Sequence, residues 1–246
     1  MIPRPESAGD FAILRRMLRG IPRNGTHAQN LQRFYAIQAP QYDRFRERLL
    51  HGRAELIERL AQGLPKQAHV VELGGGTGRN VAFFGEKIAD IQQFDLVDLC
   101  PALLDLARGR ARDLPNVRVV EADATTFRPA APVDCVYFSY ALTMIPDWRA
   151  ALSNAIAMLK PGGHLGIVDF YHSPRRPLPQ HRSHSFFTRH FWPRWFAHDG
   201  VRLDPAHLAA LCAAVPEHTL IESRAPVPYL PGLRVPYYVF VGRKPA

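Results

Sequence analysis

The sequence predicts an α/β fold, namely a doubly wound, mostly parallel, seven-stranded sheet with helices on both faces. The first observation is that short apolar segments recur from His69 onward, most of them followed by a stretch with helical spacing. This alternation is typical of parallel strands that are covered on both faces. The second observation is size, because 246 residues of which 47% are hydrophobic suit one domain with additions better than two independent domains.

The expected elements follow one another along the chain. Strands are predicted at residues 69–73, 94–99, 117–121, 133–139 and 164–170, and helices at residues 80–88, 101–114 and 148–159. Pro161-Gly162-Gly163 is expected to form a turn. Two further strands, at residues 218–223 and 237–242, are expected to form an antiparallel pair at one edge of the sheet.

Two helices are expected before the sheet begins. Apolar residues between Phe11 and Ile21 recur at helical spacing among arginines, which indicates a basic amphipathic arm. A second helix is predicted from about Pro40 to Leu60. We therefore expect residues 1–60 to form an N-terminal helical arm and cap, and residues 61–246 to form the main domain.

One segment interrupts the alternation of strands and helices. Residues 171–202 combine basic and aromatic side chains, namely Arg175, Arg176, Arg182, Arg189 and Arg194 with Phe186, Phe187, Phe191, Trp192, Trp195 and Phe196. We expect this segment to form a lid over the main domain.

The net charge of +9 and the isoelectric point near 9.9 predict an anionic partner: nucleic acid, an acidic small molecule or an anionic bilayer. The three cysteines lack CxxC spacing, which is typical of reduced thiols and predicts no metal site. The first residues lack the apolar run of a signal peptide, and no segment has the roughly 20 apolar residues that span a bilayer. A cytoplasmic protein, soluble or peripheral on the inner face of the membrane, is expected.

A glycine-rich loop follows the first predicted strand, in the pattern Glu72-x-Gly74-x-Gly76-x-Gly78. Glycine at such a turn lets the backbone approach a nucleotide closely, because it has no side chain and tolerates positive φ. Dinucleotide sites use the same position to hold a pyrophosphate. The acid at the strand end would oppose a phosphate and suits a cationic group instead.

Two more acids follow the next two strands. Asp98 comes 20 residues after Gly78, where a carboxylate can accept both hydroxyls of a ribose. Asp123 follows the third strand, where it can accept an adenine amino group while the next backbone N–H donates to the ring. The alternative is that these are turn glycines and helix-capping aspartates, and it is strongest for Asp123.

These features resemble the Rossmann-like class I methyltransferases, which use S-adenosylmethionine. The resemblance implies that the cofactor is bound by Glu72, Gly74, Gly75, Gly76, Gly78, Asp98, Leu99, Asp123, Ala124 and Ser139. It also implies that Ser139 and Tyr140, which close the fourth strand, line the face where methyl transfer occurs. A sequence of the Asn-Pro-Pro-Tyr type would suggest a nucleobase amine there, and this chain has Ser139-Tyr140-Ala141-Leu142 instead.

Further segments resemble a narrower family, the betaine-lipid methyltransferases that convert diacylglyceryl-homoserine to diacylglyceryl-trimethylhomoserine. The segments are residues 42–53, 139–148, 168–171 and 191–196 and the ending 236–244. The resemblance runs from about Tyr35 to the end of the chain, and it implies transfer of methyl groups to the amine of a membrane lipid. Residues 1–34 lie outside it.

The product of three such transfers is a quaternary ammonium, which aromatic rings can hold by cation–π attraction worth about 0.5 to 2 kcal/mol each. Tyr140 is the first candidate for this catalytic position, followed by Tyr42 and Tyr171, and the alternative is that these tyrosines only pack. Each transfer is a displacement at a sulfonium carbon. We therefore expect catalysis to depend more on holding a neutral amine in line with the methyl group than on a dedicated base.

Other polar residues are candidates for the substrate side. Arg46, Arg53 or a lid arginine could pair with the substrate carboxylate. His51 could accept the amine proton, although a lone histidine is more often structural, and Asp169 could equally be a capping or ion-pairing residue.

A lipid substrate implies an anionic membrane surface as a partner, to which the lid and the amphipathic arm could bind. The alternative for the lid is that its aromatic residues cap the pocket while its arginines are solvated. Neighbouring hypotheses for the activity are methylation of phosphatidylethanolamine or of a soluble amine. A nucleic-acid-binding protein with this fold is a more distant hypothesis, so no nucleic acid is expected.

Overall fold

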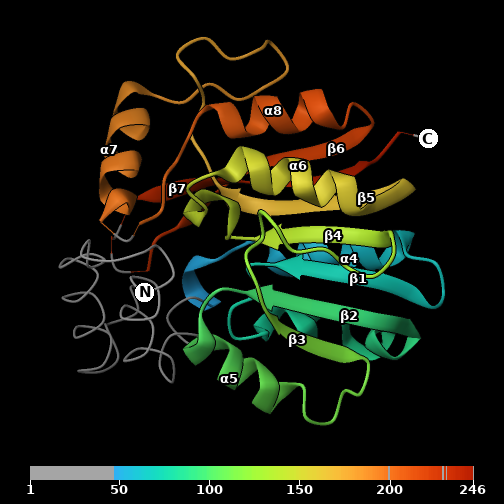
Figure 1. The fold of residues 1–246 in the computed structure, drawn as a ribbon. Helices are drawn as coiled ribbons and strands as arrows, with labels where there is room; N and C mark the ends of the chain where they lie inside the picture. Colours follow the sequence, from blue (N-terminus) through green and yellow to red (C-terminus); the bar gives the residue numbers. More distant parts are fainter. Residues whose placement is uncertain (1–46, 199, 229, 231, 246) are drawn as a thin grey trace, which may run out of the picture.

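The computed structural model describes residues 47–198, 200–228, 230 and 232–245. Seven strands form one sheet: β1 (Ala68–Leu73), β2 (Ile91–Asp98), β3 (Val117–Glu121), β4 (Val133–Ser139), β5 (Leu159–Phe170), β6 (His218–Pro226) and β7 (Arg234–Arg243). They lie in the order β3-β2-β1-β4-β5-β7-β6, as Figure 1 shows. Neighbours are parallel except β7, which is antiparallel to both β5 and β6. The predicted doubly wound sheet and its antiparallel edge pair are confirmed.

Helices cover both faces of this sheet. On one face lie α4 (Arg53–Gly63), the 3₁₀ helix η1 (Arg79–Asp90) and α5 (Pro101–Arg110), whose buried residues share a core with Val70, Phe94 and Leu96. On the other face lie α6 (Trp148–Met158) and α8 (Ala206–Ala214), which pack with Val71 and Val136. Successive strand residues therefore face opposite cores, because side chains alternate along a strand. None of the helices within the described residues is long and apolar enough to cross a bilayer.

The largest difference from the predicted elements is at the start of the described chain. Residues 47–49 are helical, but the helix is interrupted before α4 begins at Arg53, and Gly52 has φ of 79°. A Cβ on Gly52 would lie 2.7 Å from the Cε2 atom of Tyr237, so this turn depends on glycine. The expected boundary at residue 60 falls inside α4, whose residues Leu56 and Leu60 are fully buried against the sheet. The amphipathic arm lies outside the described residues.

Two smaller differences have local causes. The helix expected at residues 80–88 is instead the 3₁₀ helix η1, and it is interrupted at Gly85, which has φ of 55°. The turn expected at Pro161-Gly162-Gly163 is included in β5, where Lys244 pairs with the backbone on both sides: its N–H donates to Gly163 and its carbonyl accepts from Gly162. Hydrogen bonding to the end of the chain therefore extends the strand through the turn glycines.

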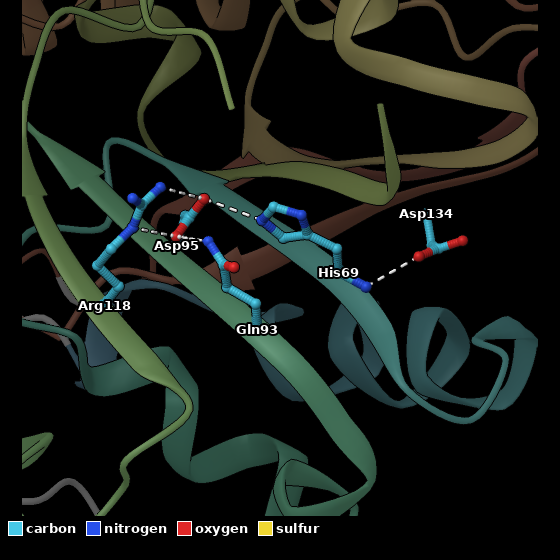
Figure 2. A network of polar contacts seen from close by, with 5 residues as sticks. All are labelled: His69, Gln93, Asp95, Arg118 and Asp134. Atoms are coloured by element: carbon cyan, nitrogen blue, oxygen red, sulfur yellow. Dashed lines mark hydrogen bonds and ion pairs between the residues drawn. The ribbon is translucent and has the colours of Figure 1, made fainter. Parts of the chain in front are cut away.

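A polar network joins the strands near their amino ends (Figure 2). The buried Asp95 of β2 accepts two hydrogen bonds from Arg118 of β3, at 2.8 and 2.9 Å, and lies 2.9 Å from Nε2 of His69 of β1. The backbone N–H of His69 donates to Asp134 of β4 at 2.8 Å. Burial alone would raise the pKa of Asp95, but the hydrogen bonds from His69, Arg118 and Gln93 outweigh it and lower the pKa to about 2. This network fixes the strands at the edge opposite the pocket described below.

The segment expected to form a lid, residues 171–202, contains α7 (Phe186–Ala197). Trp192 and Phe196 of α7 are buried in the core on the α4 side of the sheet. The loop before α7 is attached to β6, because the carboxylate of Glu222 accepts hydrogen bonds from the hydroxyl of Tyr171 and the backbone N–H of Arg182. The inner side of this segment is therefore packed into the domain.

Candidate functional site

A pocket of about 310 Å³ opens at the carboxyl edge of the sheet, where β1, β2, β3 and β4 end. Parallel α/β sheets bind ligands at this edge, where the strand order reverses, which in this sheet is between β1 and β4. Most of the residues predicted to bind the cofactor line this pocket: Gly74, Gly75, Gly76, Asp98, Leu99, Asp123, Ala124 and Ser139. Their binding role stays a prediction, but the structure brings them together.

The loop after β1 requires its glycines for both conformation and space. Gly74, Gly76 and Gly78 have φ of 75°, 55° and 72°, a left-handed region that residues with side chains rarely adopt. A Cβ on Gly74 would lie 2.4 Å from the Cβ of Ala141, which follows β4. Gly78 is not among the lining residues and instead begins η1 as its N-cap. The loop can therefore lie against β4 and still leave room for a ligand.

Glu72 lies behind the loop and is not one of the lining residues. Its fully buried carboxyl accepts a hydrogen bond from Nδ2 of Asn80 at 2.6 Å, and Oδ1 of Asn80 accepts one from Nη1 of Arg53 at 3.4 Å. Burial raises the pKa of Glu72 to about 7, although the hydrogen bond from Asn80 acts in the opposite direction. The buried hydroxyl of Tyr137 lies beside this carboxyl and also lowers its pKa. Asn80 and Arg53 do line the pocket, so they connect this carboxyl to it.

Asp98 ends β2 and is oriented by the backbone around it. Oδ2 accepts a hydrogen bond from the N–H of Gly76 and Oδ1 accepts one from the N–H of Cys100, both at 2.8 Å. A carboxylate can accept about four hydrogen bonds, so these two are compatible with further donors. This arrangement is suited to a pair of neighbouring hydroxyl groups in the pocket.

Asp123 follows β3 and caps a turn. Its Oδ1 accepts hydrogen bonds from the backbone N–H and the hydroxyl of Thr125, at 2.8 and 2.7 Å. This is the capping role that the sequence left open as the alternative to ligand binding. Asp123 and Ala124 nevertheless both line the pocket, so the capped turn forms part of its wall.

Tyr140 lies directly after β4 and has φ of 54°, an uncommon conformation for a residue with a side chain. Such strain costs about 1 to 3 kcal/mol and is found mostly at functional sites. The hydroxyl donates a hydrogen bond to the carbonyl of His51 at 2.6 Å, and the ring packs on Phe170 with centroids 4.6 Å apart. Burial raises the pKa of Tyr140 well above its ordinary range, so the hydroxyl stays protonated. Tyr140 therefore lines the pocket as an aromatic residue whose protonated hydroxyl cannot act as a base.

Tyr171, in contrast, is not among the lining residues, and its predicted catalytic position is not supported. The preceding residue, Phe170, faces the α4 side of the sheet near Tyr140, so Tyr171 faces the opposite side and packs in the core under α6 and α8. Its hydroxyl donates to Glu222 at 2.8 Å. Tyr42, the other tyrosine candidate, and Arg46 lie outside the described residues.

Among the described arginines considered for the substrate carboxylate, Arg53 is the one that lines the pocket. Its side chain is only 7% exposed, and Nε donates to the carbonyl of Leu50 at 3.1 Å. His51 contributes its backbone carbonyl to Tyr140, but its side chain is not among the lining groups.

Asp169 has a supporting position beside the pocket. It is fully buried and accepts hydrogen bonds from the backbone and the hydroxyl of Thr143, which lies in the short 3₁₀ helix η2 (Leu142–Met144). Burial raises its pKa to about 7. Asp169 therefore fixes the chain after Tyr140, which agrees with the structural alternative.

Sequence reasoning missed two groups of lining residues. One spans the end of the glycine loop and the start of η1 and comprises Thr77, Arg79 and Asn80. The position of Asn80, two residues after the last loop glycine, is a signal that could have identified it. The other group is Met144, Ile145, Pro146 and Asp147, between η2 and α6. These four residues belong to the segment 139–148 that resembles betaine-lipid methyltransferases, but that resemblance assigns a role only to Ser139 and Tyr140.

Comparisons with known proteins agree with this geometry. A family model described as a methyltransferase domain matches residues 42–205, about two thirds of the chain. The ubiquinone/menaquinone biosynthesis C-methyltransferase UbiE of Serratia proteamaculans is 27% identical over 203 residues, which cover 79% of this chain and 77% of that protein. UbiE of an Enterobacter species is 28% identical over 168 residues, which cover 65% of this chain and 66% of that protein.

Two solved structures illustrate the shared fold. The N-methyltransferase NodS from Bradyrhizobium japonicum, in complex with S-adenosyl-L-homocysteine, is 17% identical, with a TM-score of 0.59 over 79% of this chain and 86% of that chain. DhpI in complex with SAH is 20% identical, with a TM-score of 0.57 over 90% of this chain and 100% of that chain. These likenesses confirm the fold class predicted from the sequence.

Proposed function

The chain belongs to the methyltransferase domain family, and from this premise we propose that it methylates the amino group of diacylglyceryl-homoserine with S-adenosylmethionine as the donor. The product is the betaine lipid diacylglyceryl-trimethylhomoserine. The observation that carries the proposal is that the aromatic residue Tyr140 lines the pocket, while the carbonyl of His51 holds its hydroxyl. The resemblance of residues 42–53, 139–148, 168–171, 191–196 and 236–244 to betaine-lipid methyltransferases supports the choice of lipid.

The donor side of the pocket fits the proposed cofactor in two respects. Asp98 is oriented for two hydroxyl groups, as the ribose requires. Glu72 places a buried carboxyl behind the glycine loop, connected to the lining residue Asn80, and its charge suits a cationic amino acid group. When bound, the cofactor supplies an electrophilic methyl group on a sulfonium, and the pocket residues hold and orient it.

The acceptor side requires a surface for an amine that becomes a quaternary cation. The substrate ammonium loses one proton to water before each of three transfers, so three protons are released in all. The ring of Tyr140 can attract the resulting cation by about 0.5 to 2 kcal/mol, and its buried neutral hydroxyl does not compete for the amine proton. Catalysis then depends on the alignment of the amine with the methyl group in the pocket.

We assign the substrate carboxylate to Arg53, because this residue lines the pocket and is almost fully buried. An arginine in that setting forms stronger hydrogen bonds to a carboxylate than one on the surface. If Arg53 binds the lipid, Arg53→Met raises KM for the lipid at least about tenfold and leaves the affinity for S-adenosylhomocysteine within about threefold. Arg79, also in the lining but exposed and paired with Glu47, is the matched control. If Arg53→Met instead weakens only the binding of S-adenosylhomocysteine and leaves KM for the lipid unchanged, the arginine binds the donor.

A second candidate comes from the relatives, since two of those compared are named as C-methyltransferases of quinone biosynthesis. A panel of acceptors separates these activities. The protein would be incubated with labelled S-adenosylmethionine and, separately, diacylglyceryl-homoserine, phosphatidylethanolamine and a demethylated quinone. We expect label in the first lipid. Label only in the quinone would reject the proposed substrate and support the activity named for the relatives.

A further inference from the structure

We propose that the outer end of α7 and the loop before it form a docking surface for an anionic membrane. This surface comprises Leu178, Phe186 and Phe187 together with the arginines of residues 175–194. The inference rests on the proposed function, because an enzyme that methylates a diacylglyceryl lipid must reach the head group at a bilayer. Beyond the proposed function, the inference names the residues that contact the membrane and states that the membrane lipids are anionic.

Apolar exposure is concentrated on this segment. Phe186, Phe187 and Leu178 are 72%, 54% and 55% exposed, and they are the exposed large hydrophobic side chains among the described residues. All three fall within ten residues of one another. Phe186 and Phe187 are consecutive at the start of α7, and Leu178 lies in the loop before it. Exposed large apolar side chains that are concentrated on one segment indicate a surface that binds another apolar phase.

The helix does not need these side chains for its own packing. Trp192 and Phe196 already occupy the core, at 1% and 2% exposure. Within the described part of the chain, Phe186 stacks on His190 of the same helix, with ring centroids 3.9 Å apart, and Phe187 stacks on Phe191 at 4.9 Å. The two outer rings therefore extend a line of aromatic side chains away from the core toward solvent.

The charge around these rings selects the kind of membrane. Residues 171–202 contain six arginines and a single acidic residue, Asp199. Arg175, Arg176, Arg182 and Arg194 are exposed. The bond from the backbone of Arg182 to Glu222 attaches the loop to β6, so these arginines extend from a fixed backbone. Arginine beside phenylalanine and tryptophan is typical of proteins that lie on anionic bilayers.

The opposite end of α7 leads to the pocket. Phe196 stacks on Phe170 with centroids 4.6 Å apart, and Phe170 packs on Tyr140 at the same distance. Phe186 lies ten residues earlier, about 15 Å along the helix at a rise of 1.5 Å per residue. Docking through the outer end of α7 would therefore bring the pocket close to the head groups.

The test measures vesicle binding without any need for turnover. The full chain is floated with vesicles of phosphatidylcholine alone and with vesicles that also contain phosphatidylglycerol. Three double variants are compared: Phe186→Ser/Phe187→Ser, Arg175→Glu/Arg176→Glu and the control Lys66→Glu/Arg112→Glu. The control changes the net charge equally, at exposed positions that precede β1 and β3 and so lie at the opposite edge of the sheet. Folding of each variant is checked by thermal unfolding.

We expect the wild-type protein and the control to bind the anionic vesicles far more tightly than the neutral ones. Each basic residue near an anionic surface contributes about fivefold, so the arginine variant should lose at least about 25-fold. The phenylalanine variant should lose at least about tenfold. Equal losses in the control, or wild-type binding in either lid variant, would overturn the proposal. The proposal would also be overturned if the phenylalanine variant alone is monomeric in sedimentation velocity while its vesicle binding is unchanged. That result would assign the surface to contact with a second copy of the chain.

A second readout separates this inference from the proposed function. Both lid variants should methylate glyceryl-homoserine, which lacks acyl chains, as well as the wild-type protein does, and should lose activity only on vesicles. Equal losses on both substrates would contradict a docking role. If the wild-type protein binds anionic vesicles through these residues but methylates neither substrate, the docking surface stands and the proposed substrate is wrong.

Discussion

Replacing Glu72 with glutamine is expected to make the free protein more stable and, at the same time, to weaken its binding of the methyl donor. The carboxyl is fully buried, and its pKa is raised from 4.5 to about 7. This rise corresponds to about 3 kcal/mol of lost stability when the group is ionised. Glutamine keeps the acceptor for Asn80, but its amide N–H groups need an acceptor partner, which offsets about 1 kcal/mol. The net gain should be about 2 kcal/mol near pH 8.

The stability difference between Glu72→Gln and the wild-type protein should depend on pH. Because the folded pKa lies above the unfolded one, the stability that protonated Glu72 contributes is complete below about pH 4.5 and is lost as the pH rises through 7. The advantage of Glu72→Gln should therefore grow between about pH 5 and pH 8. Asp169, whose pKa is also raised to about 7, is present in both proteins and cancels in the difference.

The same carboxyl should control donor binding in the opposite direction. If ionised Glu72 attracts the amino acid part of the cofactor, the wild-type affinity for S-adenosylhomocysteine should fall about tenfold from pH 8 to pH 6. Glu72→Gln should bind more weakly at pH 8 and show little change with pH. Urea unfolding and titration calorimetry, each performed at three pH values, measure both effects. Wild-type affinity in the variant, together with no gain in stability, would refute the role we give to Glu72.

Three further substitutions test other parts of the structure. Asp98→Ala should weaken S-adenosylhomocysteine binding at least about tenfold, a loss of about 1.4 kcal/mol, and an unchanged calorimetric affinity would exclude a ribose role. Tyr140→Ala should lower kcat by about 2- to 30-fold, as expected from the loss of a cation–π contribution. Tyr140→Phe should keep kcat within about threefold and lose about 1 kcal/mol of stability, because the bond to His51 is lost. Equal kcat losses in the two variants would show that the hydroxyl matters. Asp95→Asn should lower the free energy of unfolding by about 2 kcal/mol at pH 7 in urea unfolding, because the pKa of Asp95 is lowered from 3.8 to about 2. This loss should shrink as the pH falls through that range. A loss that does not change with pH would contradict stabilisation by the ionised carboxylate.

The sheet could be predicted because its signals are local. Strands β3 and β4 have the predicted bounds, since each is a short apolar run between polar residues. The pocket residues Asp98 and Asp123 were also accessible to sequence reasoning, because each directly follows a strand whose carboxyl end must lie at the site edge.

Other parts of the site depend on contacts between segments distant in the sequence. The sequence makes Tyr171 a further candidate after Tyr140, but side-chain alternation after β5 directs it to the opposite core and to Glu222, 51 residues further along the chain. The bond between Tyr140 and His51 spans 89 residues, and the interruption at Gly52 follows from the position of Tyr237. No spacing within one segment carries such information.

The atom that receives the methyl group tests the central claim most directly. The protein would be incubated with vesicles of diacylglyceryl-homoserine and with S-adenosylmethionine labelled with ¹³C in the methyl group, and the lipid product would be studied by NMR. We predict three equivalent labelled methyl groups on the homoserine nitrogen. Labelled methyl groups that appear only on a ring carbon of an added demethylated quinone, with none on the lipid nitrogen, would contradict the proposed function.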